Sequence, residues 1–227
     1  MKKTVQFLNS LSRNNNRVWF EEHRDEYQEA KAEFEAFLFR LIPVVNALDP
    51  SVGMPEVKDC TYRIYRDIRF SGDKTPYKQH MGAYIAKGGK NSAYAGYYLH
   101  VEPASDSFCS GGIYCPEKSI LRALREEIDD SWEEFDHLVH DADFTSRYQW
   151  FASRSLKTVP KGFSKDSPAR EWLRQSDYCY FAPLSEEQLL SPGLMDLVAE
   201  RFKGMVPMNT FFNRVLRSIQ TDSVSIL

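Results

Sequence analysis

Short connections in the middle of the chain constrain its fold more than any other feature. Residues 80–87, 93–102 and 107–114 have the alternation and the aromatic or β-branched content of strands, and only turn residues separate them. Parallel strands need a crossover connection of about a dozen residues or more, which these links cannot supply. The region therefore predicts consecutive antiparallel strands in a meander.

Helical patterns precede this strand region. Apolar residues recur at spacings of three and four residues over 4–11, and again from Asn14 or Asn15 to Ile42. Pro43 follows directly, and we expect it to end or kink the second helix because proline has no backbone N–H to donate.

Helical patterns also follow the strand region. Residues 116–128 are amphipathic, and a longer pattern runs over 184–220 with expected breaks at Pro192 and Pro207. Between them, residues 178–182 have the composition of a last strand.

The order of these segments predicts the fold class. Helices at both ends and strands in the middle are typical of an α+β protein, here with a central antiparallel sheet packed by the N-terminal and C-terminal helices. The chain has 227 residues, of which 42% are hydrophobic, and this is enough for a core. We expect a single domain over residues 1–220 and a flexible tail at 221–227.

The charge balance excludes some classes of partner. The formal net charge is −3, which gives no general attraction to nucleic acid or to an anionic membrane. No window holds the roughly 20 apolar residues of a membrane span, and no signal peptide follows Met1. The cysteines form no C-x-x-C pair, which favours free thiols in a cytoplasmic protein.

Positive charge is concentrated at residues 62–78, Tyr-Arg-Ile-Tyr-Arg-Asp-Ile-Arg-Phe-Ser-Gly-Asp-Lys-Thr-Pro-Tyr-Lys, where basic residues exceed acidic ones by three. Period-2 alternation over 62–70 predicts a strand, and residues 71–73 predict a turn after it. Arg66 falls on the apolar face of that strand. We therefore expect a structural role in which its guanidinium is buried and bonded to a carboxylate or to backbone carbonyls.

The run Arg-Ile-Tyr-Arg-Asp-Ile-Arg-Phe-Ser, followed by Asp-Lys-Thr-Pro-Tyr-Lys, resembles the signature of a family of bacterial and fungal conserved proteins classed as a domain of unknown function. Residues 15–20, 111–114 and 156–163 match the same family. Its proteins are about as long as this chain, so the resemblance covers nearly all of it. The resemblance implies the boundaries of the domain and the location of a site, and it implies no activity and no catalytic residue.

We expect the positive segment to form a pocket that binds a small phosphorylated or carboxylated ligand, and turnover of that ligand is a further hypothesis. Arg63 and Arg69 share a face of the predicted strand and would hold the anion as a fork, with Tyr65 between them. The other expected contributors of positive charge are Lys74, Lys78 and, from a second basic loop, Lys161. The candidates for a general base are Asp67, Asp73 and His80.

Two other interpretations of the segment stay open. In one, its basic side chains pair with carboxylates of the acidic helix that precedes it and only hold that helix to the sheet. In the other, the same surface contacts nucleic acid or a protein partner. Because basic and acidic residues are mixed elsewhere, we expect nucleic-acid binding to be weak and salt-dependent. An exposed loop is the simplest account of Lys161.

The histidines give a weaker signal. His137-x-x-His140 has a spacing that can bind metal, but its helix is polar and no second ligand cluster follows, so we expect a surface helix and no metal site. His80 and His100 lie in adjacent predicted strands, where Tyr98, His100 and Glu102 share a face. Either histidine could be a general base, although a hydrogen-bonded sheet histidine is the simpler expectation. The sequence indicates no particular cofactor and no oligomeric state.

Overall fold

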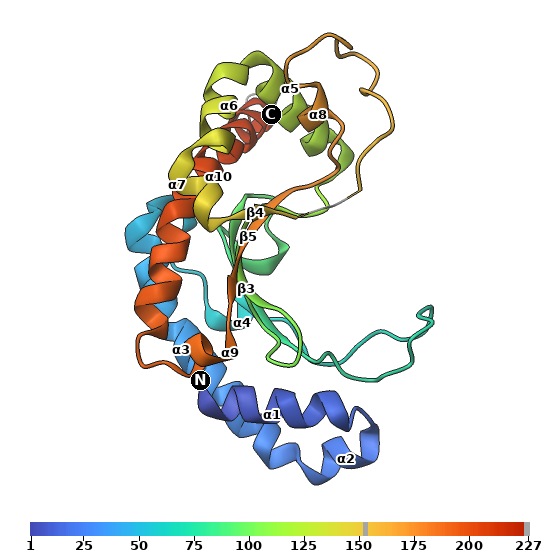
Figure 1. Cartoon of the computed structure of the whole chain (residues 1–227), viewed down its shortest axis with the longest axis vertical. Helices are drawn as coiled ribbons and strands as arrows, with labels where there is room; N and C mark the ends of the chain where they lie inside the picture. The colour runs from blue at the N-terminus through green and yellow to red at the C-terminus, as the bar shows by residue number, and fades with distance from the viewer. Residues whose placement is uncertain (152–153, 225–227) are drawn as a thin grey trace. The chain divides into compact units, whose positions relative to one another are not determined.

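The computed structural model describes residues 1–151 and 154–224, with the side chains of these residues up to 216. An antiparallel sheet with the strand order β1-β2-β3-β5-β4 organises the chain (Figure 1). Its strands are β1 (Met81–Ile85), β2 (Gly96–Val101), β3 (Ser107–Ile113), β4 (Gln149–Trp150) and β5 (Tyr178–Leu184). The predicted α+β fold, with this sheet packed by N-terminal helices and a long C-terminal helix, is confirmed.

The helices lie before and after the first strands, as predicted. Those on the N-terminal side are α1 (Lys2–Arg13), α2 (Arg17–Glu22), α3 (Arg24–Leu48), the short η1 (Pro50–Val52) and α4 (Val57–Cys60), and η2 (Gly89–Asn91) lies between β1 and β2. Those after β3 are α5 (Lys118–Asp130), α6 (Trp132–His140), α7 (Ala142–Arg147), α8 (Arg170–Leu173), α9 (Glu186–Leu190) and α10 (Leu194–Val224). The expected break at Pro192 is confirmed, because it lies between α9 and α10.

Two prolines that we expected to interrupt helices lie inside them instead. Pro43 is within α3 and Pro207 is within α10. Each proline removes the hydrogen bond to the carbonyl four residues before it, which belongs to Phe39 in α3 and to Lys203 in α10. Both of these residues are exposed, so water can reach the carbonyl. Burial of the apolar side chains on either side of each proline therefore stabilises the helix by more than the loss of one backbone hydrogen bond destabilises it.

The C-terminal helix continues past its expected end. α10 runs to Val224, so residues 221–224 of the expected tail are helical. The rest of that tail, residues 225–227, lies outside the described residues. Neither α10 nor any other described helix has the length and apolar character that crossing a membrane requires.

The first compact unit comprises residues 1–91, 97–110 and 183–203. In it β1 and β2 pair so that Met81 lies opposite Val101. One face of this pair is apolar and buried, and its residues are Met81, Ala83, Ile85, Tyr97, Leu99 and Val101. The Tyr97 ring lies 5.3 Å from that of Phe202 in α10, and its hydroxyl donates to the Asp49 carboxylate at 2.9 Å. The alternate residues of both strands face the other way, and they form the polar side of the sheet.

The second compact unit comprises residues 92–96, 111–182 and 204–227. Two buried asparagines of α10 bind the backbone of its extended segments. Asn209 accepts from the Gly112 N–H at 2.9 Å and donates to the Gly96 carbonyl at 3.0 Å. Asn213 accepts from the Ala95 N–H at 2.8 Å and donates to the Ala95 carbonyl at 3.0 Å. Hydrogen bonds as well as apolar contacts therefore hold this helix in the unit.

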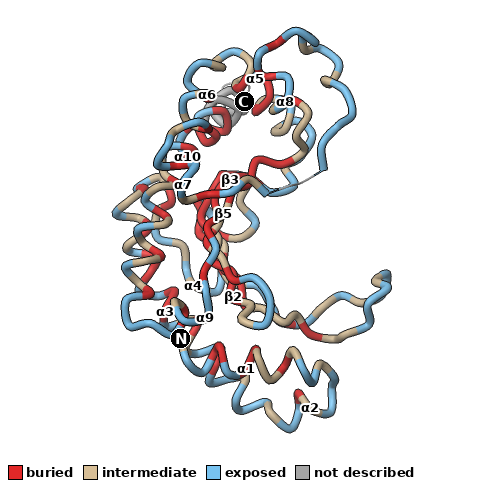
Figure 2. The backbone as a smooth tube through the Cα atoms, in the orientation of Figure 1, coloured by how far each residue is buried: buried red, intermediate tan, exposed pale blue. Residues whose placement is uncertain are grey.

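Residues 62–79, which we call the arm, form an irregular extended loop, so the strand predicted over 62–70 is wrong (Figure 1, teal). Its two sides pair only near their base, where an isolated bridge joins Tyr65 and Tyr77. Ile64 is 3% exposed, but Phe70 is 96% exposed, with the Arg69 guanidinium 5.9 Å from the centre of its ring (Figure 2 shows the exposed tip). A strand is stabilised by what its side chains pack against, so regular alternation without such a surface does not produce one.

Candidate functional site

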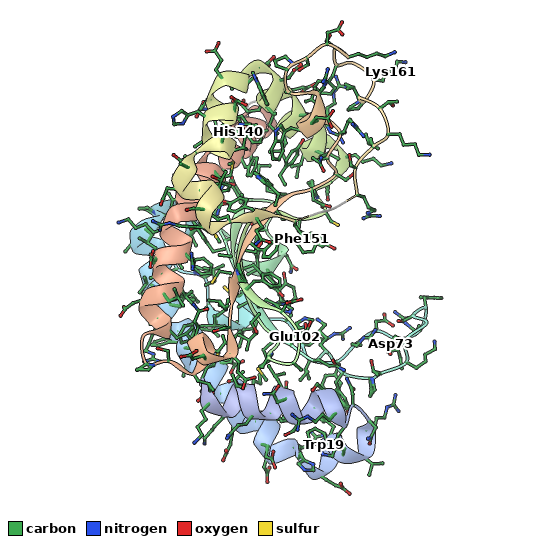
Figure 3. The ribbon with its side chains drawn as sticks, viewed as in Figure 1. Trp19, Asp73, Glu102, His140, Phe151 and Lys161 are labelled. Carbon is green, nitrogen blue, oxygen red and sulfur yellow. The ribbon has the colours of Figure 1, made fainter. Side chains whose placement is uncertain are left out.

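Arg66 is bonded within the arm. Its guanidinium donates to the Asp73 carboxylate, to the Thr75 hydroxyl and, at 3.2 Å, to the Thr75 carbonyl. A carboxylate or carbonyl partner was expected and is present, but the side chain is 25% exposed and not buried, and the apolar strand face on which we placed it does not form. Asp73, a predicted base, is thus engaged with an arginine on the arm (Figure 3).

Arg69 is also paired locally. It donates to both oxygens of the Asp67 carboxylate, at 2.9 and 2.6 Å, and its side chain is 76% exposed. The Lys74 Nζ donates to the Ile68 carbonyl at 3.0 Å. The strand that was to place Arg63 and Arg69 on one face is absent from residues 62–70, so the predicted fork loses its geometric basis.

Tyr65 packs at the base of the arm. Its ring lies 6.1 Å from that of Phe20 and 5.5 Å from that of Tyr77, and Tyr77 stacks on Phe20 at 3.9 Å. The Asn15 side chain accepts from the Tyr77 N–H at 3.2 Å and donates to the Tyr77 carbonyl at 2.9 Å. These contacts attach the arm to α2 and to the turn that precedes it.

Lys161 lies in the second compact unit, in the loop between β4 and α8 (Figure 3). Its residue is exposed, which agrees with the simplest account of this loop. A contribution of Lys161 to a ligand pocket stays a prediction.

Three residues near the base of the arm, Tyr62, Arg63 and Lys78, form what we call the arm root. The Lys78 Nζ lies 5.5 Å from the centroid of the Tyr62 ring. Lys78 is half-buried, and neither it nor Arg63 forms an ion pair with a carboxylate of the described residues. Burial lowers the pKa of Lys78, and the positive charge of Arg63 lowers it further. The root therefore holds two neighbouring positive charges, neither of which forms an ion pair with a described carboxylate, although the charge of Arg63 also acts on Asp67 from further away.

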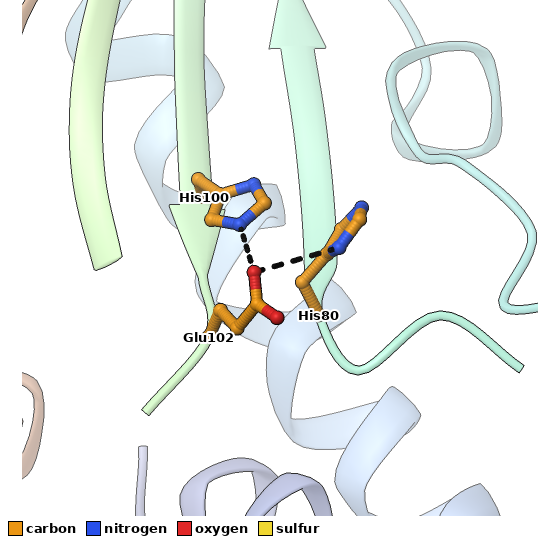
Figure 4. A group of neighbouring side chains, drawn as sticks. All are labelled: His80, His100 and Glu102. Carbon is orange, nitrogen blue, oxygen red and sulfur yellow. Dashed lines mark hydrogen bonds and ion pairs between the residues drawn. The ribbon is translucent and has the colours of Figure 1, made fainter. Parts of the chain in front are cut away.

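His80 follows the arm directly and meets two residues of β2 and its end. In the register of β1 and β2, Gly82 lies opposite His100 and Met81 lies opposite Val101. The next residues along, His80 and Glu102, therefore lie beside each other. The Glu102 Oε2 lies 3.0 Å from the His100 Nε2 and 3.9 Å from the His80 Nδ1 (Figure 4). The two imidazole centroids are 4.3 Å apart. We call His80, His100 and Glu102 the histidine cluster.

Neighbouring side chains hold His100 in place. Its Nδ1 lies 3.0 Å from the Tyr98 hydroxyl, and its ring stacks on Phe108 of β3 with centroids 4.6 Å apart. Tyr98 passes so close to Gly82 that a Cβ on Gly82 would lie 2.4 Å from its hydroxyl oxygen. Glycine at position 82 therefore leaves room for the tyrosine that contacts His100.

Burial keeps both imidazoles neutral near neutral pH. The pKa of His80 falls to about 3, first through burial and then through the nearby charges of His100 and Lys78. Burial also lowers the pKa of His100, although the hydrogen bond and negative charge of Glu102 act in the opposite direction. A neutral imidazole has a nitrogen lone pair, so it can accept a proton or bind a metal ion.

The histidine cluster is only partly foreseen by sequence reasoning. His80 is a predicted base, and Tyr98, His100 and Glu102 were expected on one face, but Glu102 was not assigned to a site. The missing information is the register of β1 against β2, because the connection between them includes η2 and is longer than a Gly-Gly turn. With the register known, two imidazoles and a carboxylate have ligand atoms within 4.8 Å of one another, and this group could hold a metal ion.

The other histidine pair lies on α6 and is exposed, as expected for a surface helix. The His140 Nδ1 is 3.0 Å from the Asp136 carboxylate one turn earlier. Both residues belong to one exposed helix face, so this pair provides a natural control for the histidine cluster.

Comparisons with known proteins show which family the chain belongs to. No curated protein and no solved structure matches the chain. The family model described as conserved hypothetical protein (DUF2461) matches residues 3–211, which include the arm and the histidine cluster. This match confirms the resemblance carried by the signature at residues 63–78. The chain belongs to the DUF2461 family of conserved hypothetical proteins.

Proposed function

We propose that this protein binds a small phosphorylated or carboxylated ligand at the arm root. Lys78 and Arg63 supply the positive charge, and His80 lies next along the chain. The proposal keeps the class of ligand expected from the sequence. It differs from that expectation in placing Lys78, and not Arg69, at the centre of the binding site. We expect the ligand among the small metabolites of the cytoplasm, the location favoured by the sequence.

The observation that carries the proposal is the lack of a counter-ion at the root. Arg66 and Arg69 each have a carboxylate partner on the arm, whereas Lys78 and Arg63 have none among the described residues. A positive charge held partly out of water without a partner is unfavourable, and a second positive charge beside it adds repulsion. An anion bound here would relieve both effects, with a guanidinium to hold it and an ammonium to add charge.

The same geometry ranks the candidates for a general base. Asp67 and Asp73 accept hydrogen bonds from arginines, so their carboxylates are already engaged. His80 lies two residues beyond Lys78 and has a neutral ring, so it is the candidate best placed to take a proton from a ligand at the root.

A thermal-shift screen tests the proposal. Inorganic phosphate and a set of phosphorylated and carboxylated metabolites are added to the wild type and to Lys78→Gln and Lys74→Gln. At a hundredfold excess over Kd, a ligand stabilises by about 2.7 kcal/mol, which is roughly 5–10 °C for a chain of this length. We expect Lys78→Gln to lose this shift and Lys74→Gln, on the exposed part of the arm, to keep it.

The unliganded variants separate binding from structure. Because Lys78 lacks a counter-ion, Lys78→Gln without ligand should melt at the wild-type temperature or above it. A lower melting temperature, together with no metabolite that stabilises the wild type, would contradict the proposal. Salt-dependent binding of single-stranded DNA that Lys78→Gln and Lys74→Gln weaken equally would instead favour a nucleic-acid surface.

A further inference from the structure

We propose that the histidine cluster, His80, His100 and Glu102, binds one divalent first-row transition ion, with Zn²⁺ as the reference ion. The ligands would be the His80 Nδ1, the His100 Nε2 and the Glu102 carboxylate. This inference goes beyond the anion site and does not depend on it, because Lys78 and Arg63 hold the anion and neither of them binds the ion. With the ion bound, the His80 Nδ1 serves as its ligand and not as a base.

The spacing of the ligand atoms fits such an ion. The Glu102 Oε2 is 3.0 Å from the His100 Nε2 and 3.9 Å from the His80 Nδ1, and all candidate atoms lie within 4.8 Å of one another. Zn²⁺ binds imidazole nitrogen and carboxylate oxygen at about 2.0–2.2 Å, so tetrahedral ligands lie about 3.3 Å apart. The His80 Nδ1 must therefore move closer to the carboxylate when an ion binds, and its side chain, which is 28% exposed, is the one of the two imidazoles with more room to do so.

A purely structural role leaves His80 unexplained. Neither of its ring nitrogens forms a hydrogen bond with the described residues, and its Nδ1 remains 3.9 Å from Glu102. The side chain is 28% exposed, so water still reaches the ring, but no described residue fixes the direction of its nitrogens. Contact with the tilted His100 ring, with centroids 4.3 Å apart, nevertheless keeps it beside a carboxylate that already serves the other imidazole. A metal ion supplies the bond that His80 lacks.

The second nitrogen of His100 is placed as in a metal ligand. Its Nδ1 lies 3.0 Å from the Tyr98 hydroxyl, and Phe108 stacks on the ring. When an ion occupies Nε2, the imidazole proton resides on Nδ1 and is donated to the Tyr98 oxygen. Metal-binding histidines commonly make such a contact through their other nitrogen, because it fixes the tautomer and the ring orientation.

The donor set indicates the class of ion. Two imidazoles and one carboxylate suit Zn²⁺ and its first-row neighbours, whereas Mg²⁺ and Ca²⁺ prefer oxygen ligands. Three protein ligands leave coordination positions for water or a bound ligand. The charge of Lys78 opposes a cation here, while that of Glu102 favours it, and an anion bound alongside the ion would offset the repulsion.

Metal titration of the whole chain tests the inference. Protein treated with a chelator, and then freed of it, is titrated with Zn²⁺ by calorimetry and with Co²⁺ by visible absorption. We expect one ion per chain and a Co²⁺ spectrum without thiolate charge-transfer bands. Loss of an outer contact to a metal ligand typically costs about 10–100-fold in affinity, so His80→Ala and Glu102→Gln should each cost at least about 100-fold. His140→Ala, which removes the exposed histidine beside Asp136, should change nothing.

A second measurement needs no variant and guards against misfolding. In the wild type, Zn²⁺ should shift the ring-nitrogen resonances of His80 and His100 and leave those of His140 unchanged. Absence of saturable binding to the wild type would overturn the proposal, and so would full binding by both His80→Ala and Glu102→Gln. Shifts confined to His140, or thiolate bands with Co²⁺, would also overturn it by locating the ion elsewhere.

Discussion

The arm and the histidine cluster adjoin in the sequence but differ in how their polar side chains are paired. On the arm beyond its root, Arg66 has Asp73 and Arg69 has Asp67, so each of these two guanidinium groups meets a carboxylate a few residues away. In the cluster, His80 lies directly before β1, His100 lies in β2 and Glu102 directly follows β2, and His80 has no hydrogen bond among the described residues. The arm is irregular and mostly exposed, whereas the cluster lies on a regular sheet.

This difference shows that a high density of charged residues does not by itself indicate a binding site. A segment rich in both arginine and aspartate can neutralise itself, so the density of its charges says little about a ligand. A polar group without a partner arises where strand pairing fixes its position and the neighbours cannot adjust. Unpaired groups at the arm root and in the cluster are therefore better indicators of function than the paired groups on the arm.

The largest effect should come from the glycines of the two regions. Gly82→Ala adds a Cβ that would lie 2.4 Å from the Tyr98 hydroxyl oxygen, so the tyrosine must leave its contact with His100. Overpacking of this kind typically costs about 1–3 kcal/mol. Gly72→Ala on the arm meets nothing within 4 Å and should stay within about 0.5 kcal/mol of the wild type. Urea unfolding of the three proteins measures both values, and equal losses would remove the distinction between a packed face and an open arm.

Asparagine substitutions test where the arm is attached. Asn15→Ala removes the hydrogen bonds to the Tyr77 N–H and carbonyl, at 3.2 and 2.9 Å, and should cost about 1–2 kcal/mol. Asn14→Ala removes one exposed hydrogen bond, to the Ser10 carbonyl, and should lower the free energy of unfolding by only about a few tenths of a kcal/mol. Urea unfolding gives the free energies, and limited proteolysis shows whether cleavage within 62–79 increases. Faster cleavage in Asn14→Ala than in Asn15→Ala would place the attachment elsewhere.

Arginine substitutions compare two pairs within the arm. Arg66→Met breaks bonds to Asp73 and Thr75 from a side chain that is 25% exposed, and it should cost about 1 kcal/mol, well below the loss expected for a buried ion pair. Arg69→Met breaks an exposed pair with Asp67 and should cost less than about 0.5 kcal/mol. Thermal unfolding checks the order of the two losses. A larger loss from Arg69→Met would mean that the arm is held by its tip.

The fold was predictable to the extent that local patterns decide it. Apolar periodicity located the flanking helices and the strands near residues 81, 96 and 107, because their side chains do become buried. Pro43 misled the prediction because a local rule was overruled by packing of α3 on both sides of it. The strand predicted for the arm was wrong for the opposite reason. Its residues alternate as in a strand, but near Phe70 the apolar side chains have no protein surface to pack against.

The candidate site was predictable only in part. The charges of Arg63 and Lys78 and the imidazole of His80 are visible in the sequence, but their lack of hydrogen-bond or ion-pair partners among the described residues is not. That lack depends on the register of β1 and β2 and on which carboxylates Arg66 and Arg69 occupy. Strand register across a connection that includes η2 is a long-range property, and a single sequence does not specify it.

The smallest effect concerns the pH dependence of the arm. The pKa of Asp73 falls from 3.8 to about 2, chiefly because it accepts from the Thr75 N–H, then from Arg66 and the Thr75 hydroxyl. A carboxyl with a lower pKa in the folded chain than in the unfolded chain stabilises above its unfolded value. The Asp73 contribution should therefore be complete above about pH 4 and should disappear as the pH falls towards 2. An NMR titration of the Asp73 carboxyl carbon measures this pKa directly.

The pKa of Asp73 can then be used to separate the effect of Arg66 from that of Thr75. Arg66→Met should raise the pKa of Asp73, but not to 3.8, because the Thr75 N–H is the larger cause and remains in the variant. The pKa of Asp67, lowered chiefly by Arg69, should stay unchanged and serves as the control. An Asp73 that titrates near 3.8 in the wild type would show that solvent, rather than Arg66 and Thr75, satisfies this carboxylate. The arm would then carry uncompensated charge like the root, and the contrast with the histidine cluster would fail.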